Sequence, residues 1–343
     1  MFYCLCNYLN GVIPNPIPIP NSNRDDNTQC IDEGKRGKKT YRWIRSAGGK
    51  NHKISFLNST KPLSPFTNGE LPVCRLDSSI DSPLPVILMC LGRSGSSATW
   101  QVMSKLTGHC FRGREITGST KQQNKEIFSS IKPGQNGNWI LEYLCSQQND
   151  FKDKGGIIGF KWKPFEGKFS DGAIDGLRMI AKHTDPPIKV VRMRRNCLDV
   201  ILSLEKHKSI PPGKAAHCTP GDTECITLHK KIGAGMHLKT NNLLDLLEQL
   251  TKEEDNVDKK LEELKVPHVK VSYEDLYFSD DAEEWMKIFR FIGRGPGSKL
   301  SRGQVEEAME HVGTSDRSHK VTISNYDEIV DLLKGTKFEA LLH

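Results

Sequence analysis

Short apolar segments alternate with amphipathic segments from about residue 84 to the end of the chain. Apolar runs of strand length occupy residues 86–91 and 188–193, and strands also fit residues 156–162 and 266–271. Helical spacing of apolar residues predicts helices at 97–106, around 127–144, and at 172–183, 198–206, 237–264, 282–292, 303–312 and 326–333. Strands that alternate with helices favour a parallel sheet with helices on both faces. We therefore expect a three-layer α/β/α domain with a central parallel sheet over residues 84–343.

Residues 1–80 lack this alternation. Pro14, Pro16, Pro18 and Pro20 alternate with Asn and Ile and indicate an extended, polyproline-like segment. A basic run at 34–53, with aromatic residues interleaved, is either a polyanion-binding patch or a solvated linker. We expect residues 1–80 to form a low-order N-terminal segment or linker.

Composition adds few constraints. The 343 residues, 36% of them hydrophobic, suffice for one substantial core with or without a smaller appendage. The net charge of +7 suits an anionic partner, and we expect no nucleic acid. No apolar run reaches the roughly 20 residues of a membrane helix. The first residues lack a basic region and a cleavage site, so no signal peptide is expected; the remnant of a membrane anchor is the alternative.

The ten cysteines show no paired CxxC spacing, and we predict no metal site. Cys218 and Cys225 bracket the polar segment CTPGDTEC, where a local disulfide is geometrically plausible. A glycosylation sequon occurs at 58–60. Together these features favour a Golgi or secretory lumen over the cytoplasm, with ten reduced thiols in a cytosolic enzyme as the alternative.

The segment from Val86 to Leu106 is the first candidate for chemistry. Its apolar strand is followed by a glycine-rich turn and then by a helix, so several backbone N–H groups lie at a helix N-terminus, where an anion binds well. The residues that we expect to contact the anion are Arg93, Ser94, Gly95, Ser96 and Ser97. No Gly-Lys-Ser/Thr closes the turn, so it is not a Walker A loop. A tight turn whose small residues serve only packing is the alternative.

A second candidate anion site follows the strand at 188–193. Arg195 leaves the carboxyl end of that strand, and Ser203 lies about two turns into the next helix. In open α/β sheets, ligands collect at these strand ends. An arginine fork and a hydroxyl suit a second phosphate, unless Arg195 is a surface ion-pair partner and Ser203 an ordinary helix residue.

These two segments resemble PAPS-dependent sulfotransferases, where PAPS is 3′-phosphoadenosine 5′-phosphosulfate. Arg195, Asn196, Asp199 and Ser203 match the family's 3′-phosphate pattern Arg-Asn-Pro-x-Asp-x-x-x-Ser, with Cys197 in place of Pro. The turn GRSGSS is similar to the 5′-phosphosulfate loop of the carbohydrate-type branch. YEDL at 273–276, FIG at 291–293 and ISNY at 323–326 resemble later family segments, so the likeness covers residues 84–340.

The resemblance implies a P-loop-like fold and transfer of a sulfonate from PAPS to an acceptor hydroxyl or amine, with a glycan as the expected acceptor. The 92–97 loop would hold the 5′-phosphate and sulfonate, with Arg93 stabilising charge, while Arg195 and Ser203 would hold the 3′-phosphate. Arg317, His319 and Lys320 would close over the nucleotide, although the family's Arg-Lys-Gly signature is absent.

A general base must accept the acceptor's proton. Glu115 occupies a place where relatives often have Gly-x-Glu, and His109 is the competing candidate; either one could instead be a surface residue. Lys161 resembles a cleft lysine of some relatives, or is a buried stem with a solvated head.

Two other functions remain open from sequence. A nucleotide-dependent kinase would use the same fold, but the Walker lysine and an obvious Walker B acidic strand end are missing. A non-catalytic polyanion-binding protein would use the basic run at 34–53.

Overall fold

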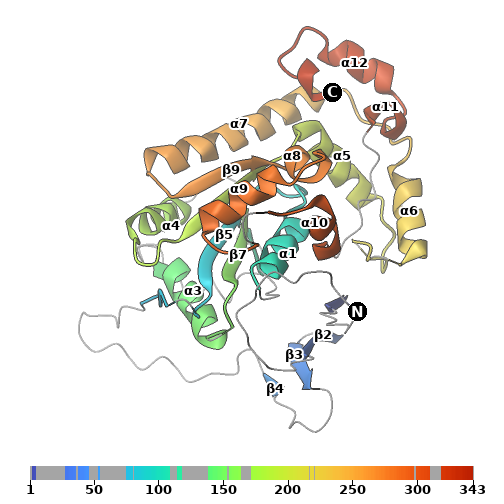
Figure 1. Ribbon diagram of the computed structural model, residues 1–343. Coiled ribbons are helices and arrows are strands. Elements are labelled where there is room, and N and C mark those ends of the chain that lie inside the picture. Colours follow the sequence, from blue (N-terminus) through green and yellow to red (C-terminus); the bar gives the residue numbers. More distant parts are fainter. Residues whose placement is uncertain are drawn as a thin grey trace. The chain divides into compact units, whose positions relative to one another are not determined.

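The computed structural model describes residues 75–79, 81–108, 114–117, 138–152, 154–163, 171–215, 217–219, 221–296, 299–309 and 318–342, and backbone strands within residues 1–73 (Figure 1). The chain divides into two compact units, Met1–Val73 and Cys74–His343. The division lies close to the boundary expected near residue 80.

In the first unit, four backbone strands form an antiparallel sheet in the order β1-β2-β3-β4. They are β1 (Phe2–Cys4), β2 (Thr28–Lys35), β3 (Lys38–Arg45) and β4 (Lys53–Ile54). The pattern of residues 1–80 predicts none of them, although only two residues separate β2 from β3, as in a tight hairpin. The prediction of low order for the remainder, and the side chains of the basic run at 34–53, lie outside the described residues.

The second unit is built on a five-stranded sheet in which every pairing is parallel, with the order β6-β7-β5-β8-β9. The strands are β5 (Leu84–Met89), β6 (Arg114–Thr117), β7 (Ile157–Lys163), β8 (Lys189–Arg194) and β9 (His268–Ser272). The four predicted strands correspond to β5, β7, β8 and β9. β6 was not predicted, because its four residues lie in a polar stretch and form an edge strand.

Helices cover both faces of this sheet, which confirms the three-layer α/β/α fold (Figure 1). One face packs against α3 (Asn138–Asp150), α4 (Asp171–Lys182) and α7 (Leu243–Glu263). The other packs against α1 (Ser96–Leu106), α8 (Tyr273–Phe278), α9 (Glu283–Ile292) and α10 (Arg302–Ala308). Successive side chains of a strand point to opposite faces, so β5 buries Ile87 and Met89 on the α7 side and Val86 and Leu88 on the α1 side.

A third apolar cluster lies beside the sheet. It joins α5 (Cys197–Lys208) to the N-terminal end of α7, α12 (Tyr326–Leu333) and the 3₁₀ helix η1 (Glu339–Leu342). Its buried members include Leu198, Leu202 and Leu247. This cluster fixes α5, which carries the second candidate anion site.

Several helices differ from the sequence-based expectation. The segment expected to be one helix over 237–264 begins only at Leu243. The polar region before it contains α6 (Thr223–Gly233), whose N-terminus is capped by the Asp222 carboxylate, which accepts from the Cys225 N–H at 3.0 Å. α8 and α11 (His319–Thr322) are too short to show a helical period. None of the helices in the described ranges is both long and apolar enough to cross a bilayer.

A buried ion-pair cluster links β8 to α7. The Arg192 side chain is 0% exposed, contacts Glu254, and donates from Nε to Asp258 Oδ1 at 2.6 Å. Next to it, Arg194 pairs with Asp255 at 3.0 Å. Arg192 and Arg194 therefore hold α7 against the sheet. Arg195, the third arginine of this run, instead contacts the 92–97 turn.

Candidate anion-binding site

The two candidate anion segments lie side by side because their strands are hydrogen-bonded neighbours. β5 pairs in parallel with β8, with Met89 opposite Arg192. The 92–97 turn therefore leaves the sheet at the same edge as Arg195. The sequence predicts that the 92–97 turn and Arg195 each follow a strand. The pairing of β5 with β8 brings them together into one site.

The 92–97 turn has an unusual backbone conformation. Arg93 and Gly95 both have left-handed backbone angles, with φ values of 65° and 80°. Gly95 is required here, because a Cβ would lie 2.3 Å from Cε2 of Tyr273. The Ser94 hydroxyl donates to the Leu91 carbonyl at 2.9 Å and so stabilises the turn itself. The N-cap residue of α1 is Gly95, which has no side chain to bond the first N–H groups of the helix, so these groups suit an anionic ligand.

Arg195 holds this turn from the neighbouring strand. Its Nη1 donates to the Arg93 carbonyl at 2.9 Å, and its guanidinium stacks on the ring of Tyr273 with 4.3 Å to the centroid. Its buried Nε has no hydrogen-bond partner among the described residues. A buried charged donor without a partner is costly unless an anion binds it. The Arg195 site therefore suits an anionic ligand.

Ser203 and Arg93 complete the contact between the two segments. Arg93 Nε donates to Ser203 Oγ at 3.3 Å. Burial, together with the nearby charge of Arg195, lowers the pKa of Arg93. Beside them, a small pocket is lined by Arg195, Asp199, Leu202, Ser203, Lys206, Gly233, Met236 and Thr322. Arginine, lysine and hydroxyl donors converge on this pocket, as expected for a phosphate site.

The other two matching residues of the 195–203 segment hold the structure around this pocket. Asn196 caps α5 by accepting from the Leu198 N–H at 2.9 Å, and its amide donates to the Leu341 carbonyl at 2.8 Å. Asp199 Oδ1 lies 2.9 Å from His319 Nε2. This hydrogen bond raises the pKa of His319 and so favours the protonated imidazole beside the Asp199 carboxylate.

The base candidate Glu115 lies at the edge of the sheet among lysines. On β6 it is opposite Lys161 of β7, and its carboxylate lies 3.6 Å from Lys161 Nζ and 2.5 Å from Lys163 Nζ. Burial raises the pKa of Glu115, but the two lysines outweigh burial and lower it. Lys161 also donates to Ser97 Oγ at 2.9 Å and so connects Glu115 to the turn.

The structure gives less information on the remaining predicted site residues. His109 and Arg317 lie outside the described residues. Lys320 is exposed and makes no ion pair or hydrogen bond with the described part of the chain. Its neighbours on α11 do reach the pocket region: His319 binds Asp199, and Thr322 lines the pocket.

Three residues of the site were missed from sequence: Lys163, Lys206 and Tyr273. Lys206 follows Asp199 and Ser203 at helical spacing on α5, a signal that was available in the sequence. Lys163 was assigned to no site, since the expected strand ended at 162. Tyr273 belongs to the YEDL segment, but only the fold places its ring between Gly95 and Arg195.

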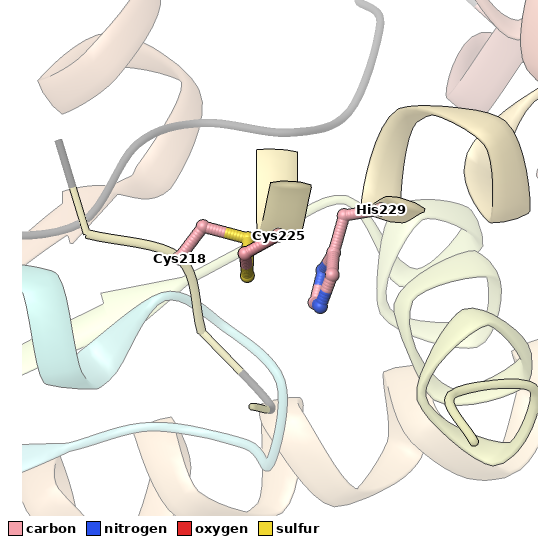
Figure 2. A group of neighbouring side chains, drawn as sticks. All are labelled: Cys218, Cys225 and His229. Carbon is pink, nitrogen blue, oxygen red and sulfur yellow. A yellow bond between two sulfur atoms is a disulfide. The ribbon is translucent and has the colours of Figure 1, made fainter. Parts of the chain in front are cut away.

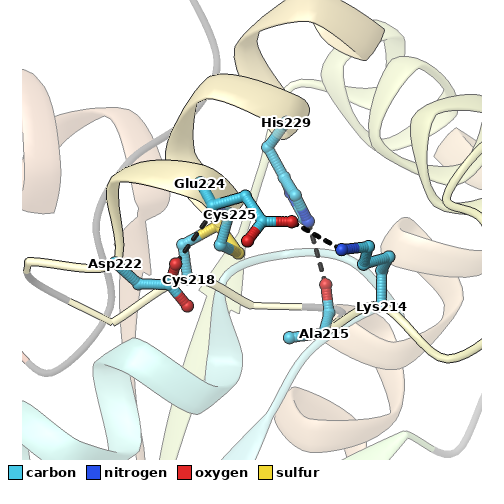
Figure 3. The surroundings of a disulfide bond; sticks show 7 residues. All are labelled: Lys214, Ala215, Cys218, Asp222, Glu224, Cys225 and His229. Atoms are coloured by element: carbon cyan, nitrogen blue, oxygen red, sulfur yellow. Dashed lines mark hydrogen bonds and ion pairs between the residues drawn. A yellow bond between two sulfur atoms is a disulfide. The ribbon is translucent and has the colours of Figure 1, made fainter.

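The predicted disulfide between Cys218 and Cys225 is present, with 5.5 Å between the Cα atoms. His229 lies beside it, and the three side chains form a group of potential metal-binding atoms within 4.8 Å of one another (Figure 2). Because both sulfurs are joined in the disulfide, neither is a thiolate ligand. His229 Nε2 instead donates to the Ala215 carbonyl at 2.9 Å, and Lys214 pairs with Glu224 at 2.6 Å (Figure 3). The disulfide and these two polar contacts therefore stabilise α6 and the segment before it.

No known protein-family model and no curated protein sequence matches the chain. The geometry of the site is therefore the basis on which a function can be assigned.

Proposed function

We propose that this chain is a PAPS-dependent sulfotransferase that transfers a sulfonate to an acceptor hydroxyl or amine. One observation carries the proposal: the bond from Arg195 to the Arg93 carbonyl, at 2.9 Å, joins the 92–97 turn to the Arg195–Ser203 segment. A ligand that spans both halves needs two separate anionic groups. A nucleoside with a 5′-phosphosulfate and a 3′-phosphate meets this requirement.

Bound PAPS would supply an activated sulfonate: the acceptor oxygen forms a bond to sulfur while the bond from sulfur to the phosphate oxygen breaks. Negative charge then grows on that phosphate oxygen. Arg93 and the N–H groups at the start of α1 would stabilise it. An arginine keeps its proton at neutral pH, so Arg93 stabilises charge and is not a general acid. Lys161 lies within reach of Ser97 and adds a second cation on the other side of the turn.

The acceptor's proton would pass to Glu115. The lysines beside it keep the carboxylate ionised at neutral pH, which is the form that a base requires. They also weaken its basicity, so an acceptor has to displace at least one lysine contact as it binds. His109 is the competing base.

A carbohydrate acceptor is proposed from the resemblance of GRSGSS to the carbohydrate-type branch. The Cys218–Cys225 disulfide supports an oxidising compartment, where glycans are modified, since disulfides persist in secretory spaces and are rare in the cytosol.

The direct test is calorimetric binding of adenosine 3′,5′-bisphosphate (PAP), followed by turnover of PAPS against a panel of glycans, phenols and small alcohols. PAP binding that survives deletion of residues 1–80 supports the enzyme, whereas a polyanion-binding protein that uses the basic run would lose its affinity. Turnover should persist in EDTA, because the proposed site relies on arginine and lysine. Activity that vanishes in EDTA and returns with magnesium would instead support the kinase.

A further inference from the structure

Lys206 is a buried lysine that no predicted role explains. It lies on α5 and is 6% exposed, and it lines the same pocket as Arg195 and Ser203. Gly233, at the end of α6, faces it so closely that a Cβ there would lie 3.0 Å from Lys206 Nζ. The ammonium group is thus held at the wall of the pocket, between α5 and the end of α6.

Two like charges act on Lys206, those of Arg93 and Arg195. Arg195 and Lys206 line the small pocket, and Arg93 contacts Ser203, another of its lining residues. The acidic residue that lines the pocket, Asp199, is already hydrogen-bonded to His319. Like charges brought together out of water repel, and the repulsion is relieved when an anion with more than one negative charge binds among them.

We propose that Lys206 binds the 3′-phosphate of the nucleotide together with Arg195 and Ser203, and so makes the pocket selective for nucleotides that carry a second phosphate. This inference rests on the proposed function and assigns Lys206 as a binding residue of the same site. Three donors around one phosphate match its three terminal oxygens. The geometry explains why α5 places a lysine one turn after Ser203, on the face toward α6.

If Lys206 binds the phosphate, proton uptake should accompany binding, which a packing role would not produce. Burial, with added repulsion from Arg93 and Arg195, lowers the pKa of Lys206 to about 8. At pH 8 about half of the Lys206 side chains are therefore neutral. A phosphate is doubly charged at this pH and favours the ammonium form, so binding should draw up to about half a proton onto Lys206. His207, whose pKa burial lowers, is neutral at this pH, and His319 is held by Asp199.

The experiment compares PAP with adenosine 5′-monophosphate, which lacks the 3′-phosphate. Calorimetry at pH 8 in two buffers of different ionisation enthalpy, such as HEPES and Tris, gives both affinity and proton uptake. The variants are Lys206→Met, which keeps length and removes the charge, and Gly233→Ala, which displaces the ammonium group without changing it. Lys208→Met is the matched control, because Lys208 lies on the same helix but is exposed and paired with Glu205 at 2.6 Å.

For Lys206→Met we expect PAP to bind about 10- to 100-fold more weakly, with the monophosphate affected less than about threefold. Proton uptake on PAP binding should fall toward zero. Gly233→Ala should shift both quantities in the same direction, and Lys208→Met should leave both unchanged. If PAP binds the wild-type protein but Lys206→Met keeps its preference and its proton uptake, the role of Lys206 is refuted while the proposed function stands. If PAP fails to bind the wild-type protein, both are refuted.

Discussion

Truncation of Arg195 tests the site most directly, because this side chain holds the turn and faces the proposed 3′-phosphate at once. In the free protein it donates a hydrogen bond to the Arg93 carbonyl at 2.9 Å and stacks on Tyr273. Its buried Nε has no hydrogen-bond partner among the described residues of the free protein. Arg195→Ala therefore removes more from the complex than from the free protein.

The magnitudes follow from these contacts. A charge-assisted hydrogen bond to phosphate contributes about 1.5–3 kcal/mol, which corresponds to a roughly 10- to 150-fold rise in the Kd for PAP. In the free protein, one hydrogen bond and one stacking contact contribute about 1 kcal/mol each. The loss is partly offset, because removing Arg195 relieves its repulsion of Arg93 and Lys206. We therefore expect the free energy of unfolding to change by less than about 2 kcal/mol.

The assay is calorimetric titration with PAP, alongside chemical denaturation of the same samples. Arg194→Ala is the matched control, since the adjacent arginine points toward α7 and pairs with Asp255. It should leave PAP affinity within about twofold of wild type. Arg195→Lys should recover only part of the loss, because a lysine restores the charge but not the planar fork. Equal PAP affinity for wild type and Arg195→Ala would refute this assignment.

Three further predictions test other parts of the domain. Glu115→Gln should lower turnover by about two decades or more with PAP affinity nearly unchanged; a rate within a few-fold of wild type in single-turnover experiments would exclude it as the base and make His109 the next residue to mutate. The raised pKa of His319 means that its bond to Asp199 stabilises the fold fully below the unfolded pKa of about 6.5, and that this stability is lost as pH rises through the folded pKa. Asp199→Asn should therefore flatten the fall of Tm as the pH rises above about 6.5, and an unchanged slope would contradict the coupling. Cys218→Ser opens a loop of seven-residue separation and should cost about 2 kcal/mol of unfolding free energy in denaturant titrations, without an effect on PAP affinity.

The sequence alone determined the central layer of the domain. β5, β7 and β8 are largely buried on both faces, so each appears as a nearly continuous apolar run, whereas the edge strand β9 buries alternate residues. The same runs located the 92–97 turn and Arg195 at strand ends. The Cys218–Cys225 disulfide was readable because the polar segment between these cysteines is short.

Only the tertiary structure decided which residues at the strand ends come into contact. β6 is four residues long and gains its place only by pairing with β7, which brings Glu115 against Lys161 and Lys163. The sequence does not predict the separate roles of the three neighbouring arginines either. Arg192 and Arg194 contact α7, whereas Arg195 contacts the 92–97 turn. The direction of each side chain depends on which element packs on that face of the sheet.

Lys206 shows the same limit most clearly. Its position on α5 is written in the sequence, but its burial depends on the end of α6 closing over it at Gly233. A lysine in a polar helix pattern is normally solvated, and its pKa is then ordinary. Only the packing of two helices that are separate in sequence, beside two arginines from two strand ends, turns it into a buried cation. Local pattern fixes where a charge sits along the chain, whereas desolvation and neighbouring charges, which are properties of the fold, decide what that charge can do.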